Sequence, residues 1–199
     1  MTNSVTRLAW CCAVVIVVVT NSGLASAAPA QWGISDGGNE HWYEAINISG
    51  GVTWEEANSH ATSLGGYLVT LTSPHEDNWV YDNLDSYNLW IGAYQDISAP
   101  DYSEPAGGWR WTTGENWDYT NWSNGLDNND ILSEPEEEFA HYCCDGSWND
   151  IYDVNRNSGI STRKNFLVEW DSYPVPEPSS IVLVLAGLLA AAGVGYQRR

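Results

Sequence analysis

The chain has 199 residues, of which 13% are aromatic, and a formal net charge of −19 at pH 7. Such an acidic surface disfavours nucleic acid and anionic lipid as partners and suits cations. Between two apolar ends, residues 28–175 are long enough for one domain with a substantial core.

The first residues have the pattern of a secretory signal peptide. The basic residue Arg7 precedes the apolar run "LAWCCAVVIVVV", and the small residues Ala25-Ser26-Ala27 follow it. We therefore expect residues 1–27 to be removed on export. A retained membrane helix is the alternative, and the small residues at the expected cleavage site disfavour it.

The next segments predict a strand and then a helix. Alternating apolar and polar residues in "HWYEAINI" predict a strand over residues 41–48. Thr53 followed by Glu56 predicts a capping box at the start of a helix, and Gly65-Gly66 predicts the end of that helix. The face predicted to be buried is formed by Trp54, Ala57, Ala61 and Leu64.

A second helix follows the short predicted strand "YLVTLTS". Ser73 is its predicted N-cap, Pro74 occupies the first helical position, and Glu76 is placed to close a second capping box. The side chains predicted to face the core are Trp79, Val80 and Leu84.

After the predicted strand "NLWIGAY", regular periodicity stops between Ala99 and Asp145. Within this loop, "GGWRWTTG" predicts a short hairpin arm with Trp109 and Trp111 on one face. A loop this long and rich in tryptophan is more typical of a functional segment than of a disordered one. "SWNDIY" and "KNFLVEW" predict two closing strands, so the fold class expected is α+β.

The run "CCDGSWNDIY" allows two interpretations. Asn149 and Asp150 could bond their own backbone in a turn, or their oxygens could be ligands for a hard cation. Cys143 and Cys144 predict neither a disulfide with each other nor a zinc site, because adjacent cysteines strain a bridge and lack partners at the usual spacing. His141 is predicted to be a strand residue.

Several motifs in order resemble the C-type lectin-like domain, in its bacterial form, from about His41 to Trp170. They are "WEEANSHATSLGGYLVTL", "LWIGAYQD", "GGWRWTTGENWDYTNWSNG", "WND" and "FLVEW". The resemblance implies two helices packed on small antiparallel sheets with a long irregular loop. Core filling is the interpretation of Trp54, Trp79, Trp90, Trp148 and Trp170.

The same resemblance implies a calcium site. The family's ligand triplet falls on Leu126-Asp127-Asn128, its downstream glutamate on Glu137, and its last two ligands on Asn149 and Asp150. The implied ligands, of Ca²⁺ and of sugar, are therefore Asn128, Glu137, Asn149 and Asp150. Leu126 offers no oxygen and Asp127 replaces the family's proline, so the expected site is weakened, with Asp127, Asp130 and Glu134–Glu138 near enough in sequence to substitute.

The resemblance implies that the calcium ion and its ligands would also bind the sugar. Two adjacent hydroxyls would complete the shell of the ion, and Trp117 or Trp122 could stack on the apolar face of the sugar. The family's first disulfide falls on Ala61 and Val168, both apolar, and its second falls near Phe139 and Asp153.

The C-terminal segment 176–199 resembles the PEP-CTERM sorting signal of Gram-negative bacteria. Pro176-Glu177-Pro178 precedes an apolar run, Ile181–Gly195, and the chain ends on Arg198-Arg199. The resemblance implies transient membrane anchoring through a short helix, processing by an exosortase-type enzyme, and attachment or release at the cell surface. A plain C-terminal transmembrane anchor is the alternative.

The leading functional hypothesis is an exported, calcium-assisted module that binds carbohydrate, such as exopolysaccharide or the glycan of a neighbouring cell. The alternative is a calcium-independent structural or adhesive matrix protein with the same fold, which Leu126 and the missing proline favour. No enzyme is predicted, because no nucleophile–base pair stands out among the many carboxylates.

Overall fold

The computed structural model describes residues 28–123, 137–143, 145–152 and 164–174. The helices are α1 (Trp54–Ser63), α2 (Pro74–Asn83) and a short 3-10 helix, Ile34–Asp36. The strands are β1 (Ala30–Gln31), β2 (Trp42–Ile46), β3 (Tyr67–Leu68), β4 (Leu89–Gln95), β5 (Trp109–Trp111), β6 (Phe139–Tyr142), β7 (Trp148–Ile151) and β8 (Asn165–Trp170).

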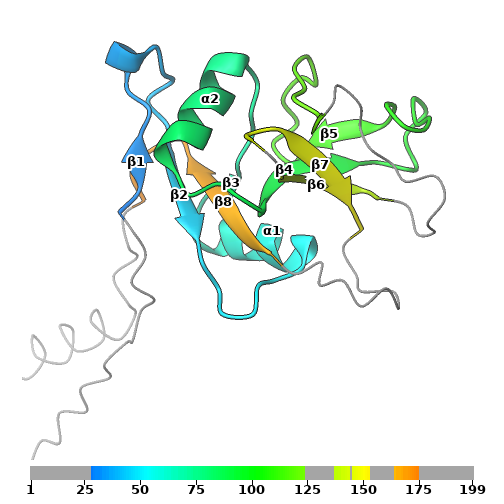
Figure 1. Ribbon diagram of the computed structural model, residues 1–199, viewed down its shortest axis with the longest axis horizontal. Helices are drawn as coiled ribbons and strands as arrows, with labels where there is room; N and C mark the ends of the chain where they lie inside the picture. The colour runs from blue at the N-terminus through cyan, green and yellow to red at the C-terminus, as the bar shows by residue number, and fades with distance from the viewer. Residues whose placement is uncertain (1–27, 124–136, 144, 153–163, 175–199) are drawn as a thin grey trace, which may run out of the picture.

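The described strands form one sheet in the order β1-β2-β8-β4-β6-β7, with β3 also paired to β8 and β5 to β4. β2 runs antiparallel to β8, from Trp42 opposite Trp170 to Ile46 opposite Phe166, whereas β4 and β8 are parallel. The first and last parts of the domain therefore lie side by side, and β5, β6 and β7 lie at the other end (Figure 1). The predicted α+β class is confirmed.

Helix α1 begins as the sequence predicts. The Glu56 N–H donates to Thr53 Oγ1 at 3.2 Å, and the Thr53 N–H donates to Glu56 Oε2 at 3.0 Å, so both halves of the capping box form. Trp54, Ala57 and Ala61 are buried, as expected. The prediction for Leu64 is wrong: the helix ends at Ser63, and Leu64 is its C-cap with 47% of its surface exposed.

Helix α2 forms only half of its predicted capping box. Ser73 Oγ accepts from the Glu76 N–H at 3.2 Å, but the Glu76 carboxylate turns inward instead of bonding the Ser73 N–H. It accepts from the Thr72 N–H at 2.9 Å and from the Tyr43 hydroxyl at 2.8 Å. The Glu76 carboxylate can be buried because Tyr43 of β2 supplies it with a hydrogen-bond donor.

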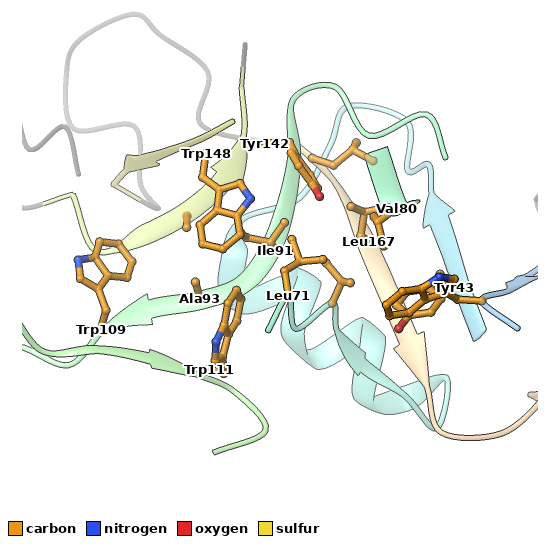
Figure 2. Packing of buried hydrophobic residues seen from close by; sticks show 14 residues of the cluster. Tyr43, Leu71, Val80, Ile91, Ala93, Trp109, Trp111, Tyr142, Trp148 and Leu167 are labelled. Atoms are coloured by element: carbon orange, nitrogen blue, oxygen red, sulfur yellow. The ribbon is translucent and has the colours of Figure 1, made fainter. Parts of the chain in front are cut away.

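Two apolar clusters make the core. One joins α1 to β8 and contains Ala61 and Val168, the positions of the family's first disulfide, both fully buried. The other contains Trp109, Trp111 and Trp148, which gather around the small side chain of Ala93 on β4 (Figure 2). The core interpretation is confirmed for the buried Trp54, Trp90, Trp148 and Trp170, and Trp79 packs half-buried against the second cluster.

Candidate functional site

The Trp-Asn-Asp segment is a strand and not a turn. The turn lies before it, where Asp145 and Gly146 have φ angles of 52° and 80°. A Cβ on Gly146 would lie 3.1 Å from the Tyr81 ring, so glycine suits both the backbone and the space. Strand β7 then pairs with β6, with His141 opposite Asn149 and Ala140 opposite Asp150. The expectation that His141 lies in a strand is confirmed.

Asn149 and Asp150 start on opposite faces of β7, since neighbouring residues of a strand alternate. Asp150 is buried on the side of Trp148, and Asn149 is half-buried on the side of His141. The Asn149 amide nevertheless donates to the Asp150 carbonyl oxygen, so it is turned along the strand toward its neighbour. The Asn149 amide therefore lies beside the main-chain oxygen of Asp150.

Glu137 lies two residues before β6, which begins opposite Ile151 of β7. Its neighbour Glu138 is held to β4, because the Glu138 carbonyl accepts from the Gln95 N–H at 2.8 Å. Glu137 is half-buried and lies toward the C-terminal end of β7. Strand β7 thus carries Asn149 and Asp150, and Glu137 lies just before the paired strand β6. Asn128, like Leu126 and Asp127, lies outside the described residues.

The oxygens of these side chains are of the types that coordinate a hard cation. Ca²⁺ prefers carboxylate, amide and carbonyl oxygens and takes about 6–8 of them. In the part of the chain that the structure describes, no group of three or more His, Cys, Asp or Glu side chains is arranged to hold a metal ion. Asn128 and the neighbouring carboxylates of its loop fall outside that part. The ligand roles of Asn128, Glu137, Asn149 and Asp150 stay predictions.

Five tryptophans surround the start of β7 and are here called the tryptophan cluster: Trp109, Trp111, Trp117, Trp122 and Trp148. Trp122 forms an isolated β-bridge with Trp148, and its ring centroid lies 5.8 Å from that of Trp148 and 4.7 Å from that of Trp109. Trp109, Trp111 and Trp148 are buried, whereas Trp117 and Trp122 are half-buried. The two tryptophans predicted to meet sugar are therefore the two that keep exposed surface.

Asp77 of α2 is a buried residue of this region that sequence reasoning missed. Its carboxylate accepts from the Tyr119 hydroxyl and the Asn121 amide, both at 2.9 Å, from the Tyr142 hydroxyl, and from Trp148 Nε1 at 3.5 Å. Burial raises the pKa of Asp77, and these four donors act against that rise. Asp77 lies in the first turn of α2, where an acidic side chain interacts favourably with the helix dipole. Nothing in the local sequence indicates its four hydrogen-bond partners.

A second buried carboxylate network joins the two ends of the domain. Glu169 of β8 is contacted by His41 Nδ1 at 2.7 Å, by the Tyr43 hydroxyl at 3.3 Å and by the Thr70 N–H at 2.9 Å. The Tyr43 hydroxyl also reaches Glu76. Burial raises the pKa of Glu169 to about 7, and the hydrogen bond with Glu169 raises the pKa of His41. The sequence did not indicate this network, because its members come from distant segments.

A family model described as "Lectin C-type domain" matches residues 50–160, more than half of the chain. The chain belongs to the C-type lectin domain family. A second model, the PEP-CTERM protein-sorting motif, matches residues 174–199, so this C-type lectin domain protein also carries that sorting motif. No helix among the described residues is long and apolar enough to cross a membrane, and the predicted C-terminal helix lies outside them.

Several curated relatives match over about two thirds of this lectin-domain chain. Halomucin of Haloquadratum walsbyi is 29% identical over 65% of the chain and 2% of its own length. Asialoglycoprotein receptor 2 of Mus musculus is 26% identical over 64% of the chain and 40% of its own length. The chain therefore spans less than half of either relative.

Solved structures share the fold at low sequence identity. The carbohydrate-recognition domain of the mouse scavenger receptor C-type lectin has a TM-score of 0.53 and 22% identity, over 66% of this chain and 91% of that chain. The cow CD23 domain, solved in the presence of GlcNAc2Man3 oligosaccharide, has a TM-score of 0.52 and 21% identity, over 65% and 87%. A calcium-independent type II antifreeze protein has a TM-score of 0.50 and 22% identity, over 74% and 97%.

Proposed function

We propose that this protein is an exported carbohydrate-binding module that binds exopolysaccharide or another glycan with the help of Ca²⁺. The observation that carries the proposal is the tryptophan cluster at the start of β7, where the half-buried Trp122 pairs with Trp148, the residue that precedes Asn149 and Asp150. Membership of the C-type lectin domain family supports the carbohydrate class, as does a fold shared with a domain solved in the presence of an oligosaccharide.

In the proposed site, Asn128, Glu137, Asn149 and Asp150 would hold the ion, with two negative charges among them. The bound ion would supply coordination positions that two adjacent sugar hydroxyls can fill. Carboxylate and amide oxygens of the same side chains would accept hydrogen bonds from those hydroxyls. Trp122 would cover the apolar face of the sugar.

Export and display form the second part of the proposal. Residues 1–27 would be removed as a signal peptide and residues 28–175 would form the exported lectin domain, as their composition predicts. The PEP-CTERM motif supports processing by an exosortase-type enzyme, after transient anchoring through the C-terminal helix, at the surface of a Gram-negative bacterium. The net charge of −19 suits a protein that works in contact with cations.

Calorimetric titration of CaCl₂ into the purified protein tests the metal part. We expect saturable heat from the parent and none from Asp150→Asn, because the substitution removes a charged ligand and leaves the side-chain volume unchanged. Asp82→Asn is the matched control, since Asp82 is an exposed carboxylate on α2 and is not a residue of the proposed site. Equal heats from Asp150→Asn and the parent would contradict the proposed calcium ligands.

A parent protein that gives no heat would favour the alternative, a calcium-independent structural or adhesive matrix protein. The calcium-independent antifreeze protein has the same fold, so the fold does not by itself require the ion. Binding rather than catalysis is proposed in both cases.

A further inference from the structure

Asp77 joins three separate parts of the domain through one carboxylate. Its donors are Tyr119 and Asn121 from the loop, Tyr142 from β6 and Trp148 from β7. A carboxylate has about four acceptor positions, and these four donors use them. Asp77 is 2% exposed, and no Lys, Arg or His of the described residues forms an ion pair with it.

Two of these donors adjoin the residues of the proposed site. Asn121 precedes Trp122 in the chain, and Trp148 precedes Asn149. The Asn121 amide also donates to the Gly146 carbonyl at 2.8 Å, and the Asn121 carbonyl accepts from the Trp148 N–H at 2.8 Å. Asp77 therefore fixes one residue on each side of the place where the loop meets β7.

Residues 115–121 of the loop are held in place mainly by contacts of their side chains. Residues 115–121 contain no helix or strand, and the one main-chain hydrogen bond that they form with other described backbone is the bond from Trp148 to Asn121. Trp117 packs its ring on Trp111 at 4.9 Å, which holds the middle of the segment. The bonds from Tyr119 and Asn121 to Asp77 hold its end, next to Trp122.

We propose that Asp77 is a positioning residue of the carbohydrate site, which sets the place of Trp122 relative to Asn149 and Asp150. The proposal rests on the proposed function for its effect on sugar binding. Its structural part, the placement of Trp122, can be measured without a sugar. Asp77 touches no ligand in this account and acts through Asn121 and Trp148.

The test is the indole ¹H–¹⁵N signal of Trp122 in the purified full chain, assigned by loss of that signal in Trp122→Phe. We expect Asp77→Asn to shift the signal while far-ultraviolet circular dichroism stays that of the parent. Asparagine has one acceptor oxygen in place of two, so its N–H₂ group must face either the Asn121 amide or the Trp148 indole N–H, both of them donors. The Kd of the best ligand on a glycan array should rise roughly tenfold or more, the range expected when a hydrogen bond to a charged group is lost.

Tyr43→Phe is the matched control. It removes one buried hydroxyl from Glu76, the residue that precedes Asp77 on α2, but it touches neither the loop nor β7. We expect the Trp122 signal to stay in place. Tyr119→Phe removes one donor of Asp77 and should move the signal in the same direction as Asp77→Asn, and it provides the test if Asp77→Asn does not fold.

A Trp122 signal that stays in place in both Asp77→Asn and Tyr119→Phe would overturn the proposal. An equal shift in Tyr43→Phe would also overturn it, because the effect would then be a general loss of packing. A parent that binds no glycan would contradict the proposed function, and the signal of Trp122 would still decide the role of Asp77.

Discussion

Trp122 and Trp148 lie against each other, with ring centroids 5.8 Å apart, but they have different surroundings. Trp148 is fully buried, and its indole N–H contacts Asp77. Trp122 is half-buried at the edge of the tryptophan cluster. Trp148 therefore serves the core, while Trp122 retains exposed surface.

Alanine substitution should separate these two roles. Trp148→Ala should lower the free energy of unfolding by about 3–5 kcal/mol, the cost of a large cavity in a core. Trp122→Ala should cost less stability, because its ring is partly exposed already, and should weaken glycan binding. Chemical denaturation and a glycan-binding assay measure the two effects. A Trp122→Ala variant with the glycan affinity of the parent would show that Trp122 does not contact sugar.

At the scale of elements, the helices show what a local sequence signal can predict. Thr53 and Glu56 are three residues apart, and their capping box forms as predicted. Ser73 and Glu76 have the same spacing, yet Glu76 bonds Tyr43, from a segment 33 positions earlier. Local spacing predicts where a helix starts, whereas the direction of a long polar side chain depends on which strand folds against it.

The network of Glu169 predicts a pH dependence of stability, since it joins β2, the segment after β3 and α2 to β8. The pKa of Glu169 is raised from 4.5 to about 7 by burial. The folded chain therefore keeps a proton that the unfolded chain releases, and the free energy of unfolding should fall as the pH rises through this window, by at most about 3 kcal/mol. The raised pKa of His41 acts with the same sign, because its contribution is present below 6.5 and is lost as the pH rises through the raised value.

Urea denaturation of the parent and Glu169→Gln between pH 4 and pH 8 checks this prediction. Glutamine cannot ionise, so the variant should gain stability relative to the parent as the pH rises. Buried His141, whose pKa is lowered to about 3, favours the opposite trend in both proteins, so the difference between them is the informative quantity. Asp82→Asn serves as an exposed control. A difference between parent and variant that does not change with pH would contradict the assigned role of Glu169.

At the scale of the whole molecule, the order of motifs along the chain was enough to predict the fold. The helices, the hairpin arm of Trp109 and Trp111, and the two closing strands lie where they were expected. The order of strands in the sheet, with parallel β4 and β8 at its centre, could not be read from the sequence. It depends on contacts between residues far apart in the chain, which leave no local pattern.

The candidate site was predicted by the same route and with the same limit. The resemblance indicated Asn149 and Asp150, and the strand predicted for them is present as β7, with Trp122 paired to Trp148 at its start. Asp77 and its four donors were missed, because a buried aspartate has no sequence motif. The predicted ligand residues follow a short pattern in the sequence, whereas the partners of Asp77 come together only through three-dimensional packing.

A glycan array probed with the purified protein in CaCl₂ and then in EGTA tests the proposed calcium-assisted carbohydrate binding. We expect the parent to bind one class of glycan in CaCl₂, EGTA to abolish this binding, and Asp150→Asn to bind in neither buffer. Binding of equal strength in EGTA would contradict the role of calcium. The absence of binding to any glycan in CaCl₂ would contradict the assignment as a carbohydrate-binding module.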